Sequence, residues 1–169
     1  MTSRSERASV SRREFIITTG GATLCALSGS WGATGCSGAC VSNLPVAPDG
    51  SYVREQDRLL LSLTEIEELK PVGGAVIVLV DDSPNSGDHE SGVEIVVAKV
   101  GEAEYRACQN RCTHKDKELD FLPDREIFRC CSGHSTFELS GEGIEGNATE
   151  PLRLYDVQLE EDLLVVLLA

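Results

Sequence analysis

Two short Cys/His pairs, with 16 residues between them, constrain the fold of this 169-residue chain more than any other feature. The first pair is Cys112 and His114, with one residue between them. The second is Cys131 and His134, with two residues between them. Each pair is short enough to lie on a single loop, and each offers one sulfur and one imidazole. Four such side chains brought together make a metal site, so the fold must place two loops side by side.

The sequence around the two pairs predicts short strands. Residues 75–80, Ala-Val-Ile-Val-Leu-Val, form a continuous apolar run that is typical of a buried strand. A turn of helix is expected at 64–69, before Pro71. Further strands are expected at 58–63, 93–100, 104–109, 118–122, 126–130, 137–139, 143–145, 152–159 and 163–168. Many short strands with almost no helical periodicity predict an all-β fold, an antiparallel sandwich or barrel.

The N-terminal residues 1–40 are predicted to be a targeting segment rather than part of the fold. Arg12 and Arg13 precede a modestly apolar run at 15–33, which is the order of a secretory signal. The paired arginines, followed by Glu-Phe-Ile, resemble a twin-arginine (Tat) export signal, and that pathway exports proteins already folded around a cofactor. The globular part is therefore expected in the periplasm or on the outer face of the cytoplasmic membrane.

Three fates of the N-terminal segment are open: cleavage, retention as a membrane anchor, or lipidation. Residues 15–33 are long enough to span a bilayer, although four glycines weaken such a span. Ala-Thr-Gly-Cys at 33–36 loosely resembles a lipoprotein processing site, with Cys36 as the lipidated residue. The chain is thus divided into residues 1–40 as signal or anchor, 41–56 as a linker with prolines, and 57–169 as the globular domain.

The formal net charge of −13 excludes one class of partner. Such a surface repels phosphate backbones, so no nucleic-acid binding is expected. Long-range attraction would steer a basic redox protein toward it, while solubility alone would explain the charge equally well.

The order of the donors separates two kinds of metal centre. Zinc accepts two cysteines and two histidines, but zinc fingers usually place the cysteines together and the histidines together. Here each loop carries one of each, so a zinc-stapled interaction module is kept only as the outsider. In a Rieske centre, two cysteines hold one iron of a 2Fe–2S cluster and two histidines hold the other.

The paired motifs resemble those of the Rieske iron–sulfur family, and the resemblance extends over residues 58–168. Residues 73–78, Gly-Gly-Ala-Val-Ile-Val, are similar to a strand of that family. Residues 146–152 resemble the segment that covers its cluster, with Asn147 in place of a proline. The resemblance implies a Rieske-like β-sandwich or barrel with a small cluster-binding subdomain and a 2Fe–2S cofactor. The ligands it implies are Cys112, His114, Cys131 and His134.

Three positions depart from the family pattern in ways that bear on the cluster. Lys117 and Gly133 stand where membrane-complex members carry a disulfide that clamps the two loops. Phe137 stands where high-potential members have a tyrosine hydroxyl. Ser135 or Thr136 could still donate a hydrogen bond to a bridging sulfide, which raises the reduction potential. Fewer donors predict a lower potential than in the quinol-oxidising complexes.

The second motif also leaves its sulfur ligand open. Phe137 follows His134 by three residues rather than the family's four, and alignment on Phe137 would make Cys130 the ligand. The two-residue spacing to His134 favours Cys131. Cys108 and Cys130 end the strands that lead into the two loops. They could pair as a substitute clamp in an oxidising compartment, but two buried thiols are favoured.

The resemblance implies an electron carrier rather than a complete enzyme. The expected role is the iron–sulfur subunit of an exported respiratory oxidoreductase, similar to quinol–cytochrome c reductase or arsenite oxidase. A free-standing Rieske ferredoxin that carries single electrons is the alternative. The expected partner is a cytochrome or an oxidoreductase subunit, quinol is a further candidate, and membrane association is expected through the N-terminus.

Overall fold

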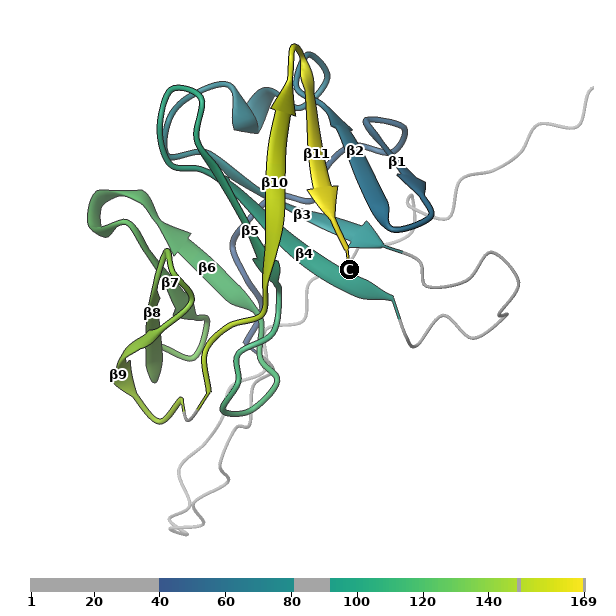
Figure 1. Cartoon of the computed structure of the whole chain (residues 1–169). Helices are drawn as coiled ribbons and strands as arrows, with labels where there is room; N and C mark the ends of the chain where they lie inside the picture. Colours follow the sequence, from purple (N-terminus) through teal and green to yellow (C-terminus); the bar gives the residue numbers. More distant parts are fainter. Residues whose placement is uncertain (1–39, 81–91, 149, 169) are drawn as a thin grey trace, which may run out of the picture. The chain divides into compact units, whose positions relative to one another are not determined.

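The computed structural model describes residues 40–80, 92–148 and 150–168, and these form two antiparallel sheets (Figure 1). The strands of the larger sheet are β1 (Tyr52–Glu55), β2 (Arg58–Ser62), β3 (Ala75–Val80), β4 (Val93–Lys99), β5 (Tyr105–Gln109), β10 (Leu154–Glu160) and β11 (Leu163–Leu167). Those of the smaller sheet are β6 (Leu119–Leu122), β7 (Ile127–Cys130), β8 (Ser135–Glu138) and β9 (Gly143–Gly146). The orders are β1-β2-β11-β10-β5-β4-β3 and β6-β7-β8-β9. The predicted all-β fold is confirmed.

The predicted strands all form, with ends close to those expected, and β1 is an additional strand. Strand β1 lies within residues 41–56, where the sequence suggested a linker, and it pairs with β2 so that Tyr52 lies opposite Leu61. The short helical turn is a 3-10 helix, Glu67–Leu69. A second one, Pro123–Arg125, turns the chain between β6 and β7.

Strands β3, β4 and β5 lie between two hydrophobic cores, which explains their continuous apolar sequence. Side chains alternate between the two faces of a strand. Val76 and Val78 therefore pack into the core of the larger sheet, while Ala75 and Ile77 pack against the smaller sheet. A strand that is buried on both faces reads as a hydrophobic run rather than as an alternation.

The second core positions the metal-binding candidates. It contains Cys112 and Cys130 together with Phe128 and Phe137, which are fully buried. Full burial of a phenylalanine contributes about 1.5–3 kcal/mol, so these rings hold the smaller sheet firmly against β3–β5.

No helix in the described part of the chain is long and apolar enough to cross a membrane. The paired arginines, the apolar run at 15–33 and Cys36 lie outside the described residues.

Candidate metal centre

Two loops carry the predicted ligands, and each leaves the end of a strand. The first loop (residues 110–118) joins β5 to β6, and the second loop (residues 131–134) joins β7 to β8. The segment at 146–152, expected to cover the site, contacts both loops. Asn147 donates its backbone N–H to the His134 carbonyl at 3.3 Å, and the Thr113 hydroxyl donates to the Glu150 carbonyl at 2.8 Å.

The structure brings together the thiols of Cys112 and Cys130 in the second core. Cys112 is 0% exposed and Cys130 is 2% exposed. Burial raises the pKa of the Cys112 thiol, and hydrogen bonds from the backbone N–H groups of His114 and Lys115 lower it. The neighbouring Cys130 thiol raises it again through a hydrogen bond and its charge. Two adjacent sulfurs, one of them facing backbone donors, suit a pair of metal-bound thiolates.

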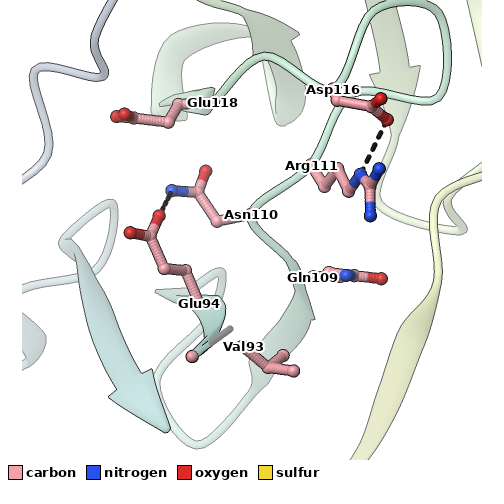
Figure 2. Close-up of a pocket in the computed structure, with 8 residues that line it drawn as sticks. Val93, Glu94, Gln109, Asn110, Arg111, Asp116 and Glu118 are labelled. Carbon is pink, nitrogen blue, oxygen red and sulfur yellow. Dashed lines mark hydrogen bonds and ion pairs between the residues drawn. The ribbon is translucent and has the colours of Figure 1, made fainter. Parts of the chain in front are cut away.

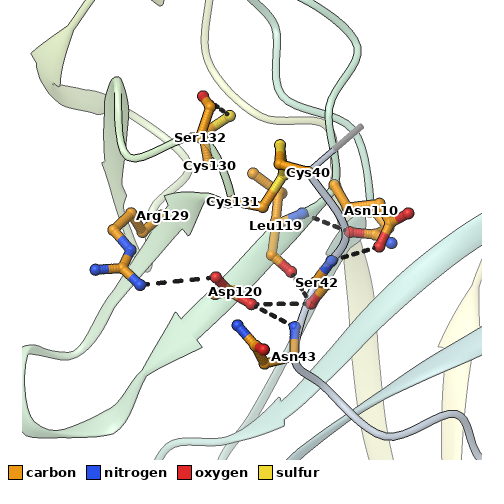
Figure 3. Close-up of a disulfide and its surroundings, with 11 residues drawn as sticks. Cys40, Ser42, Asn43, Asn110, Leu119, Asp120, Arg129, Cys130, Cys131 and Ser132 are labelled. Carbon is orange, nitrogen blue, oxygen red and sulfur yellow. Dashed lines mark hydrogen bonds and ion pairs between the residues drawn. A yellow bond between two sulfur atoms is a disulfide. The ribbon is translucent and has the colours of Figure 1, made fainter. Parts of the chain in front are cut away.

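Cys131, the expected fourth ligand, is bonded to another cysteine in the structure, and its role as a ligand stays a prediction. Cys131 forms a disulfide with Cys40, with their Cα atoms 5.7 Å apart (Figure 3). A sulfur bonded to another sulfur is not a thiolate and cannot ligate iron. Cys130 is the last residue of β7 and lies in the second core, whereas Cys131 begins the turn that follows the strand.

The alternative alignment on Phe137 carried the signal for this result. It makes Cys130 the sulfur ligand, and Phe137 lies opposite Phe128 in the β7–β8 hairpin. The Cys130 thiol also lies 3.0 Å from the Ser132 hydroxyl.

The two histidines lie on the same loops but do not join the sulfurs in a preformed group. His114 is half-buried and His134 is exposed. Within the described ranges, no three Cys, His, Asp or Glu side chains converge closely enough to hold a single metal ion. A binuclear cluster does not require such convergence, because the sulfur pair and the imidazole pair bind different irons.

Two buried hydroxyls beside the second loop have no partner. Ser135 and Thr136 begin β8 directly after His134, and neither side-chain oxygen has a hydrogen-bond partner. Buried polar groups are normally satisfied, and each exception needs an explanation. Donation to an acceptor such as a cluster sulfide would satisfy such a hydroxyl, so the residues present fit a sulfide-containing group.

Cys108 is a structural cysteine. It is free and fully buried on β5, and burial strongly raises the pKa of its thiol. Cys130 is free as well, so the substitute clamp between these two residues is not formed and the favoured expectation of two buried thiols is confirmed.

Asn110 closes the base of the first loop, and sequence reasoning missed it. Its side-chain oxygen accepts the Leu119 N–H at 2.7 Å (Figure 3). Its side-chain nitrogen donates to the Glu94 carboxylate at 2.8 Å (Figure 2). These bonds join the two ends of the loop to strand β4. No spacing or charge pattern distinguishes an asparagine at the end of a strand, so the sequence contains no signal for this role.

Comparisons with known proteins identify the family of the domain that contains these loops. A family model described as "Rieske [2Fe-2S] domain" matches residues 72–156. The structure is similar to the cyanobacterial plasma membrane Rieske protein PetC3 from Synechocystis PCC 6803, with 20% identity over 48% of this chain and 81% of that chain and a TM-score of 0.38. No curated protein matches significantly.

Two further solved structures are similar. One is the ferredoxin of carbazole 1,9a-dioxygenase from Nocardioides aromaticivorans IC177, with 22% identity, coverage of 69% of this chain and 97% of that chain, and a TM-score of 0.48. The other is the complex of reduced oxygenase and oxidized ferredoxin in carbazole 1,9a-dioxygenase, with 19% identity, coverage of 68% and 95%, and a TM-score of 0.49.

Proposed function

This chain belongs to the Rieske [2Fe-2S] domain family, and we propose that it carries single electrons between protein partners with Cys112, His114, Cys130 and His134 as the cluster ligands. A Rieske domain binds a 2Fe–2S cluster, which takes up and releases one electron at a time. The observation that carries the ligand set is the buried, adjacent pair of free thiols: Cys112 lies on the first loop, and Cys130 ends β7 directly before the second loop.

The difference in burial between the sulfurs and the imidazoles indicates the side from which a redox partner approaches the cluster. The sulfurs lie in the second core, whereas His134 is exposed and His114 is half-buried. A redox partner can therefore approach the histidine side, while the sulfur side is closed by packed side chains. The net charge of −13 supports a partner with a basic surface, and an electron-transfer rate that falls steeply with added salt would test this.

Spectroscopy on the full chain tests the cofactor and its ligands together. Reduction by dithionite should give an EPR signal, and labelling with ¹⁵N-histidine should reveal coupling to two imidazole nitrogens. About two irons and two sulfides per chain are expected. An EPR-silent protein that contains zinc would support the zinc-stapled module and reject the proposal.

The proposed role is that of an iron–sulfur subunit of a respiratory oxidoreductase. Phe137, which is fully buried and has no hydroxyl, favours a host other than a high-potential quinol-oxidising complex. We expect a potential in the lower half of the Rieske range of about −150 to +300 mV. Co-purification with a larger complex in detergent would support the subunit role, whereas elution as a single chain would support the free-standing ferredoxin.

Export to the outer side of the cytoplasmic membrane completes the proposal. Two features support it: the paired Arg12 and Arg13, and the Cys40–Cys131 disulfide, a type of bond that persists mainly in oxidising compartments. Replacing both arginines by lysine should retain the protein in the cytoplasm. The mass of the mature N-terminus would distinguish cleavage, lipidation at Cys36 and an intact anchor.

A further inference from the structure

A row of polar side chains crosses the smaller sheet on the face that points away from the second core. Each residue of the row lies directly opposite the next in register, and the members are Asp120 of β6, Arg129 of β7, Thr136 of β8 and Glu145 of β9. Their strand neighbours Phe121, Phe128 and Phe137 pack in the second core. Because side chains alternate between the two faces of a strand, the row occupies the outer face of the sheet.

Two donors in the middle of this row are buried without a partner. In the part of the chain that the structure describes, neither Arg129 Nε nor Thr136 Oγ1 has a hydrogen-bond partner, and Thr136 is only 6% exposed. Directly opposite residues of an antiparallel pair have Cβ atoms about 4.5–5.5 Å apart, so both groups lie within reach of one ligand. Buried polar groups are normally satisfied, so two adjacent exceptions indicate that an acceptor binds between them.

The neighbouring carboxylates leave these two donors free. Asp120 Oδ2 lies 3.7 Å from an outer nitrogen of Arg129, a distance that suits an ion pair but is too long for a hydrogen bond (Figure 3). Asp120 Oδ1 accepts the Asn43 N–H at 2.8 Å and the Ser42 hydroxyl at 3.1 Å. At the other end of the row, Glu145 is exposed. Asp120 therefore attracts one edge of the guanidinium and leaves Nε available.

A carboxylate matches the two donors. One of its oxygens can accept the Nε–H of Arg129 and the other the hydroxyl of Thr136, and a guanidinium binds carboxylates through strong, charge-assisted hydrogen bonds. The side chain of Arg129 is 40% exposed, so a ligand can reach it from solvent. A monoanion suits the row better than a phosphate dianion, because Asp120 and Glu145 already place two negative charges beside it.

We propose that Arg129 and Thr136 form a binding site for a small-molecule carboxylate on the outer face of the smaller sheet. Because the two donor atoms are buried, a small carboxylate reaches them more readily than a carboxylate held on the surface of another protein. The next residues along the two strands, Cys130 and Ser135, are buried beside the second loop. A bound carboxylate therefore adds a negative charge close to the cluster and lowers its reduction potential. This effect rests on the proposed function, whereas the binding does not.

Titration of acetate into the full chain labelled with ¹⁵N-arginine, at constant ionic strength, tests the binding. We expect one Nε–H signal to shift and to saturate at millimolar acetate. This signal should be missing in Arg129→Gln, and Thr136→Val should weaken binding on the order of tenfold, because each variant removes one donor. Thr136→Ser retains the hydroxyl and should restore binding.

Arg125→Gln is the matched control. It removes a cation from the turn between β6 and β7, outside the row, and should bind acetate as the wild type does. A wild-type signal that does not saturate, or equal weakening in Arg125→Gln and Thr136→Val, would overturn the site.

A redox titration with and without acetate tests the link to the cluster. Saturating acetate should lower the potential of the wild type and of Arg125→Gln, and should leave that of Arg129→Gln unchanged. A potential that falls in Thr136→Val without acetate would place the hydroxyl on the cluster side of the sheet and overturn the site. A protein that binds acetate but contains no cluster would reject the proposed function and leave the carboxylate site intact.

Discussion

The first loop is held by hydrogen bonds from its own residues, whereas the second is held by a disulfide to a cysteine 91 residues away. The first loop is long enough to bring polar side chains to both of its ends. Asn110 joins its base to Leu119 and Glu94, and Arg111 pairs with Asp116 at 2.6 Å. The second loop is short and exposed. It is held from outside by the disulfide and by two hydrogen bonds, from the Cys131 N–H to the Glu118 carbonyl and from the Asn147 N–H to the His134 carbonyl. Two loops that offer the same donors can therefore be rigid for different reasons.

Removal of a buried sulfur should have the largest effect on this pair of loops. Cys112→Ser is expected to lose nearly all of the iron, because a hydroxyl is a poor replacement for a thiolate in a soft metal site. Iron and sulfide analysis of the purified protein measures this. Cys108→Ala is the matched control, since it removes another fully buried cysteine of the same core. Equal iron loss in the control would mean that Cys112 matters only for packing.

Removal of the disulfide should have the next largest effect, and it should spare the first loop. Cys40→Ser is expected to lower the free energy of unfolding by about 2–5 kcal/mol, because the bond restricts the unfolded chain. Urea unfolding followed by circular dichroism measures the loss. Wild-type protein treated with a thiol reductant should approach the same midpoint. A midpoint equal to that of untreated wild type would show that the disulfide adds no stability.

In the first loop, the corresponding variant is Asn110→Ala, which removes the side-chain hydrogen bonds that support the loop. It leaves the Leu119 N–H without its partner, which costs about 1–3 kcal/mol of unfolding free energy. Urea unfolding measures the cost, and EPR should show altered geometry at the His114 side. Glu94→Gln retains an acceptor for the Asn110 amide and serves as the milder control. A larger effect in this control than in Asn110→Ala would place the support of the loop at Glu94 instead.

The smallest expected effect concerns the unpartnered hydroxyls of β8. A hydroxyl that donates to a cluster sulfide stabilises the reduced state, so Ser135→Ala should lower the potential by about 60 mV, equivalent to one hydrogen bond of about 1.4 kcal/mol. A redox titration measures the shift, and Thr136→Val tests the neighbouring hydroxyl. An unchanged potential in Ser135→Ala, with a shift in Thr136→Val, would assign the donor to Thr136.

The sequence was informative where local pattern decides the structure. The apolar run at 75–80 and the turn residues between strands placed β3 and its neighbours, because strand alternation and burial are local properties. The paired spacing of Cys112 with His114 likewise marked the first loop. These features do not depend on which distant segment packs against them.

The contacts of residues 40–47 and the identity of the second sulfur ligand could not be predicted in the same way. The contacts of Ser42 and Asn43 are with carboxylates 76 to 78 residues away, which no periodicity reveals. Prolines at 41–56 indicated a linker, although β1 lies there and Val46 bridges to Ile77 of β3. The pairing of Cys40 with Cys131 cannot be read from cysteine positions alone. The choice between Cys130 and Cys131 depended on where β7 ends, and strand ends are the least predictable part of a strand.

The most direct test of the ligand set compares Cys130→Ser with Cys131→Ser in iron and sulfide content per chain. The two residues are adjacent, yet one sulfur lies in the second core and the other in the disulfide. We predict that Cys131→Ser retains a full cluster of two irons per chain and that Cys130→Ser retains almost none. A full cluster in Cys130→Ser and an empty site in Cys131→Ser would contradict the account.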